Sequence, residues 1–342
     1  MEILENTLSV INGQDLMELN LPPQSFTVRG LLPQGLSILG GAPKIGKSWL
    51  MLDLCIRVAK GEPLWGMETK QGTTLYLCLE DTLRRIQHRL NCITEDVPAN
   101  AYFATASGTL ADDLEAQILQ FIREHPDTVL VVIDTFQMIR GNSNEPSYGG
   151  DYDEIQKLKR IADSQRISLL LVHHLRKQGD RDPINKLSGT TGITGAVECV
   201  FVLDKSRRRE DAATLVCTGR DIEHRELELR FSKDEFVWNL MSDSAKESMG
   251  TMPKDMVAFV EFMKQIQTYS GTNTGLAEQF SAFSGMPATP KGLKQRMNKW
   301  CYRLEDLGVT FYSRETKQGK LVDVWYKAPV SNASQISQVP VP

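Results

Sequence analysis

The chain has 342 residues, with 39 Lys and Arg against 43 Asp and Glu, and a net charge of −4. This balance excludes a protein that is basic over its whole surface, so any contact with nucleic acid would need local basic patches. The 6 cysteines are not paired at C-x-x-C spacing, and with no signal peptide or membrane-length apolar run we expect a cytoplasmic protein and no membrane partner.

Residues 1–29 are weakly patterned, and we predict either a flexible leader or an arm that docks on a neighbouring subunit. The next segment fits the P-loop pattern G-x-x-x-x-G-K-[ST], between a short apolar strand at 36–39 and a helix at 48–60. Its glycines let backbone N–H groups converge on phosphate oxygens at a helix N-terminus. We expect Lys47 to bind the β- and γ-phosphates of ATP, and Ser48 to bind Mg²⁺. The predicted nucleotide-binding residues are Gly41, Ala42, Pro43, Lys44, Ile45, Gly46, Lys47, Ser48 and Trp49.

From residue 30 to residue 240, apolar strands alternate with helices. This alternation predicts an α/β ATPase core with a mostly parallel sheet, in which ligands bind at the carboxyl ends of the strands. The expected strands are 73–79, 101–104, 129–133, 168–172, 199–203 and 214–217, followed by a hairpin of 227–231 and 235–238. The expected helices between them are 82–93, 110–125 and 152–165.

Carboxylates follow two of these strands. Asp134 ends an apolar run in the Walker B form, so we predict that it holds Mg²⁺; a surface carboxylate at a strand end is the alternative. Glu80 ends another strand, and Thr135, directly after Asp134, is not acidic. We therefore predict Glu80 as the base that polarises the attacking water, with capping of the next helix as the alternative.

A third strand ends in His173 and His174. We predict that His174 contacts the γ-phosphate and reports hydrolysis to the following loop; a pair of ordinary strand-end histidines is the alternative. That loop, residues 176–194, is polar, Gly-rich and basic, so it is expected to contact single-stranded DNA unless it is only a solvated turn. Arg220 is predicted to act as an arginine finger on a neighbouring subunit, and Arg207 is its rival.

A polar linker is predicted at 241–253, followed by a separate domain at 254–328 and a disordered tail at 329–342. Expected helices at 255–269, 274–281 and 290–307 and a hairpin of 309–314 and 322–326 describe a winged helix. Residues 290–303 contain no acidic side chain, which makes duplex DNA a reasonable partner. A protein–protein module is the alternative.

Taken together, residues 41–48, 75–81, 129–135, 169–176 and 188–203 resemble the RecA-type ATPase core of the RepA-like replicative helicases. These belong with the DnaB and KaiC relatives and occur on plasmids and other mobile elements. The resemblance implies a hexameric ring with ATP sites between subunits. It assigns Lys47 and Ser48 to the P-loop pair, Glu80 to the base, Asp134 to Mg²⁺ and His174 to the sensor, and it matches Arg220 less closely.

The sequence leaves three functions open. The first is an ATP-driven DNA helicase or translocase in plasmid or mobile-element replication. The second is a regulator or loader without motor activity, in which ATP switches assembly and the winged helix binds DNA. The third, ranked last, is a recombinase that forms filaments on DNA.

Overall fold

The computed structural model describes residues 10–19, 24–140, 148–175, 184, 187, 195–205, 211–222, 224–247, 252–316 and 319–328. The chain divides into two compact units, Pro23–Ser248 on the one hand and Met249–Pro342 with Met1–Pro22 on the other. Among the helices that the structure describes, none combines the length and apolar character that a membrane crossing requires.

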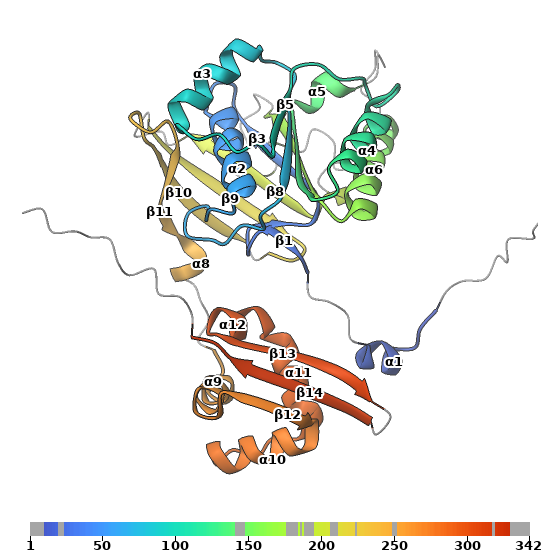
Figure 1. Cartoon of the computed structure of the whole chain (residues 1–342), viewed down its shortest axis with the longest axis vertical. Coiled ribbons are helices and arrows are strands. Elements are labelled where there is room, and N and C mark those ends of the chain that lie inside the picture. Colours follow the sequence, from blue (N-terminus) through green and yellow to red (C-terminus); the bar gives the residue numbers. More distant parts are fainter. Residues whose placement is uncertain are drawn as a thin grey trace, which may run out of the picture. The chain divides into compact units, whose positions relative to one another are not determined.

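The larger unit is built on one sheet whose described strands run in the order β11-β10-β9-β8-β3-β7-β6-β4-β5 (Figure 1). The neighbouring strands from β8 to β5 are parallel, and the remaining strands continue the sheet in antiparallel pairs. The parallel strands are β3 (Gly35–Gly41), β4 (Thr73–Cys78), β5 (Ala101–Ala104), β6 (Thr128–Asp134), β7 (Ser168–His174) and β8 (Cys199–Lys205). The antiparallel strands are β9 (Ala212–Gly219), β10 (Arg225–Phe231) and β11 (Trp238–Asp243). A two-stranded ribbon, β1 (Phe26–Val28) and β2 (Leu32–Pro33), precedes the sheet.

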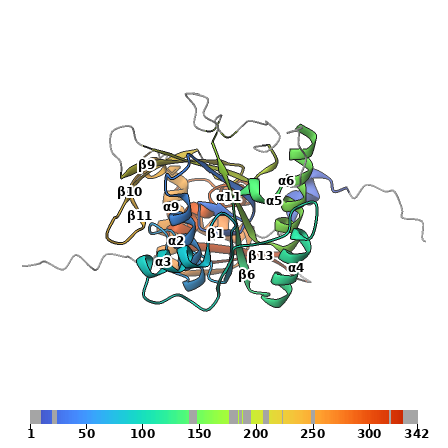
Figure 2. The same ribbon diagram turned by 90° about the horizontal axis from the view of Figure 1, so that it is seen from above.

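Helices cover both faces of this sheet, as the two views in Figures 1 and 2 show. One face packs on α2 (Lys47–Lys60) and α3 (Leu83–Ile93) through a core that includes Leu54 and Tyr76. The other packs on α4 (Leu114–Glu124), α5 (Phe136–Ile139) and α6 (Tyr148–Gln165) through a second core. Strands β3, β6 and β7 are buried on both faces, which explains why the sequence shows continuous apolar runs there. The predicted α/β core with a mostly parallel sheet is confirmed.

The register brings the polar strand ends to one edge of the sheet. Gly41 pairs with His174, and Asp134 pairs with Val172 on one side and Cys78 on the other. The P-loop, the Walker B carboxylate and the histidine therefore come from neighbouring strands. This is the edge at which a parallel sheet of this kind binds its ligand.

The end of the larger unit differs from the predicted linker at 241–253. Residues 241–243 belong to β11, and α8 (Ser244–Glu247) follows it. These residues pair with β10, and a buried ion pair joins the two strands there, with Arg225 Nη2 2.7 Å from Asp243 Oδ2. The core also begins before the predicted residue 30, because β1 already pairs with β2.

The smaller unit contains helices and a three-stranded antiparallel sheet in the order β12-β14-β13. Its described elements are α9 (Lys254–Ile266), β12 (Thr268–Thr272), α10 (Asn273–Ser284), α11 (Pro290–Lys299), α12 (Cys301–Asp306), β13 (Val309–Thr316) and β14 (Gly319–Tyr326). Phe259, Phe280 and Leu293 lie in its core. Two predictions were wrong here: the first helix ends at Ile266 and β12 replaces its last turn, and the third helix is interrupted at Trp300. The short α1 (Gly13–Glu18) lies in the N-terminal segment, and the predicted tail at 329–342 is outside the described residues.

Candidate active site

The P-loop connects the end of β3 to the start of α2. Gly46 is the residue that precedes the helix, with φ of 106°, and Lys44 also has a positive φ of 64°. A side chain at Gly46 would meet the ring of Trp238, whose Cζ2 lies 3.0 Å from the position of an added Cβ. Glycine is therefore required at Gly46 both by the left-handed backbone and by the close ring. The resulting turn directs the first N–H groups of α2 into the cavity, which suits a phosphate.

Lys47 lies beneath this turn and is 5% exposed. Its Nζ donates to the carbonyl oxygens of Gly41, at 2.9 Å, and Ala42, at 3.0 Å. Burial lowers the pKa of Lys47, while the carboxylates of Asp134 and Glu80 act in the opposite direction. A partly desolvated cation beside two carboxylates is suited to bind phosphate oxygens.

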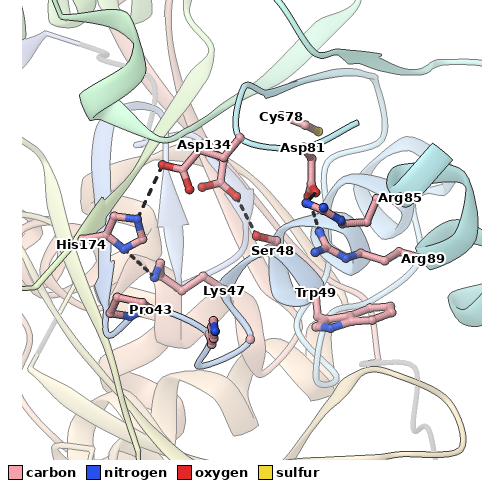
Figure 3. Close-up of a pocket in the computed structure, with 13 residues that line it drawn as sticks. Pro43, Lys47, Ser48, Trp49, Cys78, Asp81, Arg85, Arg89, Asp134 and His174 are labelled. Atoms are coloured by element: carbon pink, nitrogen blue, oxygen red, sulfur yellow. Dashed lines mark hydrogen bonds and ion pairs between the residues drawn. The ribbon is translucent and has the colours of Figure 1, made fainter. Parts of the chain in front are cut away.

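Ser48 and Asp134 form the part of the site that can hold a metal. Ser48 Oγ donates to Asp134 Oδ2 at 2.9 Å, as the dashed line in Figure 3 shows. Tyr76 Oη donates to the same oxygen at 2.7 Å. Burial raises the pKa of Tyr76 well above its usual value, which further favours the protonated form that donates this bond. Hydroxyl and carboxylate oxygens are the ligands that Mg²⁺ takes, so the residues present fit this ion.

Glu80 lies across the cavity from the P-loop, in the turn after β4. Its Oε1 accepts a hydrogen bond from Thr135 Oγ1 at 2.9 Å. His174 lies between Glu80 and Lys47: its Nε2 is 3.7 Å from Glu80 Oε1, and its Nδ1 is 3.4 Å from Lys47 Nζ. The structure thus brings together the predicted base, the predicted sensor and the P-loop lysine. The alternative role of Glu80 as a helix cap is not seen, because Thr82 caps α3.

The remaining wall of the cavity is aromatic and basic. Asp81 binds two arginines of α3, with Arg85 Nη1 at 2.6 Å and Arg89 Nη1 at 2.5 Å. The guanidinium carbon of Arg89 lies 5.4 Å from the centre of the Trp49 ring, and Figure 3 shows both arginines pointing toward Asp81. The cavity enclosed by this wall, the P-loop and the strand ends measures about 570 Å³. A volume of this size accommodates a nucleotide-sized ligand.

Arg220 lies near the amino ends of the parallel strands, opposite to the P-loop. Because β9 runs antiparallel to β8, Gly219 pairs with Cys199 at the amino end of the parallel strands. The Arg220 side chain donates to the carbonyl of Gly195 at 2.9 Å and lies 3.9 Å from Glu198. Arg220 therefore does not contact the cavity of its own chain. Arg207 and almost all of the loop at 176–194 lie outside the described residues.

Sequence reasoning missed four residues of the site. It did not identify Tyr76, Arg85 or Arg89. It noted that Thr135 is not acidic but assigned it no role of its own. The available signal for Tyr76 was a phenol hydroxyl inside the apolar run of residues 75–79. For the arginines the signal was their spacing of four and eight residues after Asp81, which lies just before the N-cap of α3 while both arginines lie on that helix.

The model of a family described as AAA domain matches residues 7–180. The DNA repair protein RadA of Helicobacter pylori strain J99 is 26% identical over 187 residues, which is 53% of this chain and 36% of that protein. RadA of Escherichia coli K12 is 23% identical over 182 residues, 51% of this chain and 34% of that protein. The chain thus covers only about a third of the length of these curated relatives.

Solved structures are also similar to this chain. The ATPase domain of G40P matches with a TM-score of 0.52 and 13% identity, over 61% of this chain and 85% of that one. A DnaB-like replicative helicase, described with its interactions with primase, matches with a TM-score of 0.54 and 12% identity, over 67% of this chain and 66% of that one. At this level of identity the likeness concerns the fold alone.

Proposed function

We propose, from the premise that this chain belongs to the AAA domain family and carries a RecA-like ATPase domain, that it is an ATP-driven DNA helicase or translocase. One observation carries the proposal: Glu80, His174 and Lys47 converge on one cavity, with His174 within 3.7 Å of Glu80 and 3.4 Å of Lys47. This arrangement can both cleave a γ-phosphate and register its loss.

ATP binds with its phosphates in the P-loop. Backbone N–H groups from Gly46 onward and the Lys47 ammonium neutralise the β- and γ-phosphate oxygens. Ser48 and Asp134 would hold Mg²⁺, and the ion would supply positive charge next to the phosphates. Arg89 and Trp49 also line the cavity, and we expect the rest of the nucleotide to lie against them.

Glu80 acts as the general base. Thr135 holds Oε1, which leaves the other carboxylate oxygen, Oε2, to accept a proton from the water that attacks the γ-phosphate. Lys47 stabilises the charge that develops on the phosphate oxygens in the transition state. The position after Asp134 holds no carboxylate, so Glu80 supplies the base from the turn after the neighbouring strand β4.

His174 couples this chemistry to DNA. It ends β7, and the chain continues directly into the basic segment 176–194. We expect loss of the γ-phosphate to change the contacts of His174 and to move that segment along single-stranded DNA. The DnaB-like and G40P matches support a ring, and we propose a hexamer with ATP between subunits.

The finger that completes such a site comes from Arg207 or Arg220. The contacts of Arg220 with Gly195 and Glu198 would have to break for that role. β8, by contrast, ends with Lys205 at the edge that bears the P-loop, two residues before Arg207. Arg207 itself lies outside the described residues, so both arginines remain candidates. The resemblance to RepA-like helicases suggests a setting in plasmid or mobile-element replication.

A second candidate function is an ATP-switched DNA-binding regulator or loader. It is favoured by the charge of the smaller unit, which has 11 Lys and Arg against 7 Asp and Glu between Pro253 and Lys327, in a chain whose net charge is −4. We propose that this unit is a winged helix, because α9, α10 and α11 are combined with the β12-β14-β13 sheet. In this reading duplex DNA binds along α11.

Turnover of ATP with and without single-stranded DNA tests the leading proposal. We expect stimulation by the DNA, and a loss of at least about a hundredfold in Glu80→Gln with nucleotide binding retained. Glu124→Gln is the control, because Glu124 lies at the end of α4 and is not among the residues that line the cavity. If DNA does not change the rate of ATP turnover and the smaller unit carries all DNA binding, the second candidate function, a regulator, is favoured. Electron microscopy with a non-hydrolysable nucleotide distinguishes rings from filaments.

A further inference from the structure

Tyr76 lies in the middle of β4, and its side chain contacts the Walker B carboxylate of Asp134 on the neighbouring strand β6. Its side chain is 2% exposed, and its hydroxyl donates to Asp134 Oδ2 over 2.7 Å. We propose that Tyr76 is a positioning residue for the carboxylate that holds Mg²⁺. The inference rests on the proposed function, in which Asp134 serves that ion.

The two hydroxyls that donate to Oδ2 of Asp134 fix the orientation of this carboxylate. Ser48 and Tyr76 both donate to this one oxygen, at 2.9 and 2.7 Å. Two donors use the two lone-pair sites of Oδ2. Within the part of the chain that the structure describes, no residue donates to Oδ1, which is therefore presented to the metal side. Because Ser48 gives its hydrogen to Asp134, its oxygen lone pairs also remain for the metal.

The sheet register makes Tyr76 suitable for this task. Cys78 pairs with Asp134 across β4 and β6, so Tyr76, two residues earlier, lies on the same face of the sheet. Its ring is fixed by the core under α2 and by Phe103, whose ring centre lies 6.4 Å away. A hydroxyl on a fixed ring holds its acceptor in one geometry. Partners of this kind behind a metal ligand typically control metal affinity and activity.

An alternative is that Tyr76 only fills the core and donates to Asp134 because a buried hydroxyl needs a partner. Both readings predict some loss of stability when the hydroxyl is removed. They differ in the response to Mg²⁺, since a core residue has no reason to change the ion concentration that nucleotide binding requires. Mg²⁺ dependence is therefore the decisive readout.

The test uses the full chain, the variant Tyr76→Phe and a fluorescent non-hydrolysable ATP analogue. Binding of the analogue is measured in EDTA and then over a series of Mg²⁺ concentrations. We expect unchanged binding in EDTA and a roughly tenfold rise in the Mg²⁺ concentration that gives half of the full enhancement. Tyr102→Phe is the matched control. Tyr102 lies in β5, its ring packs against Phe121 and His125, and it is not among the residues that line the cavity. This variant should leave the Mg²⁺ curve unchanged.

The result that overturns the inference is a Tyr76→Phe curve that coincides with the wild-type curve while Asp134→Asn shifts it. Equal loss of binding with and without Mg²⁺ in a variant that still melts cooperatively also overturns it, since that assigns Tyr76 to the core alone. If the wild-type chain shows no Mg²⁺-dependent nucleotide binding, the proposed function itself is wrong and the inference falls with it. The wild-type curve therefore separates the two failures.

Discussion

Thr135 donates a hydrogen bond of 2.9 Å to Glu80 and so ties the end of β6 to the turn after β4. Thr135 is 1% exposed, whereas the Glu80 side chain is 48% exposed, so a buried hydroxyl holds a carboxylate that stays open to the cavity. The residue directly after Asp134 can thus orient a base but cannot be one. The last residue of β6 and the residue after it have different partners. Asp134 accepts hydrogen bonds from Ser48 and Tyr76, and Thr135 donates one to Glu80.

Replacing Thr135 by Val should slow ATP turnover without weakening nucleotide binding. The loss of one hydrogen bond to a charged group leads us to expect a fall in kcat of about tenfold. Thr135→Ser keeps the hydroxyl and should restore most of the rate. Steady-state kinetics together with nucleotide affinity check this; a kcat that stays at the wild-type value in Thr135→Val would contradict the role.

His174→Asn should uncouple ATP turnover from DNA. The imidazole lies between Lys47 and Glu80, so its removal should abolish the stimulation by single-stranded DNA and reduce basal turnover less. His173→Asn is the control, because His173 packs edge-on against Phe136, on the other face of the sheet. Turnover measured over a range of oligonucleotide concentrations decides the matter. A similar fall in basal and stimulated rates would show that His174 serves the chemistry and not the coupling.

Gly46→Ala should abolish nucleotide binding and lower the stability of the fold. Its φ of 106° and the ring of Trp238, 3.0 Å from an added Cβ, both oppose a side chain, and we expect a cost of about 1–3 kcal/mol. Gly66→Ala is a matched control: its φ is 80°, but an added Cβ meets nothing within 4 Å. Thermal melts and nucleotide titrations of both variants separate backbone strain from collision with the ring. If both variants lose equal stability and both bind nucleotide, Trp238 has no part in shaping the P-loop.

Much of the larger unit could be predicted because its strands are uniform apolar runs with polar ends. The predicted bounds of the strand at 129–133 and the observed Thr128–Asp134 differ by one residue at each end. The edge strand β11 was misplaced because its exposure alternates and its residues read as a polar linker. β12 was missed for a similar reason: Thr268–Thr272 is polar and mostly exposed, and it becomes a strand only by pairing with β14.

Only part of the site could be predicted in the same way. Glu80, Asp134 and His174 carry a local signal, since each follows an apolar strand. The hydrogen bonds of Tyr76 and Thr135 depend on β4 lying next to β6, and the order of strands in a sheet is not encoded in any single segment. The distance of Arg220 from the cavity has the same cause, because it follows from β9 being antiparallel.

Lysines on α11 should control the affinity of the smaller unit for duplex DNA. Lys291 and Lys299 are exposed and Lys294 is partly exposed, whereas Arg296 is bound by Asp255 at 2.8 Å. Changing the three lysines to Gln should weaken binding and reduce the slope of log K against log salt by about 0.9 for each DNA phosphate that is no longer neutralised. Lys264→Gln on α9 is the control, because Lys264 pairs with Glu261. Salt titrations that give parallel lines for the triple variant and the wild type would rule out α11 as the DNA-binding surface.

The P-loop is supported by a tryptophan from the C-terminal part of the larger unit. Trp238 Nε1 donates to the carbonyl of Gly46 at 3.3 Å, and Trp65 donates to the carbonyl of Trp238 at 2.6 Å. A shortened chain that stops at residue 240, the predicted core boundary, would keep this brace but would remove Asp243 and leave the buried guanidinium of Arg225 without its carboxylate. Truncation for separate expression of the ATPase unit should therefore retain residues through 247, so that the final strand and the helix after it stay in place.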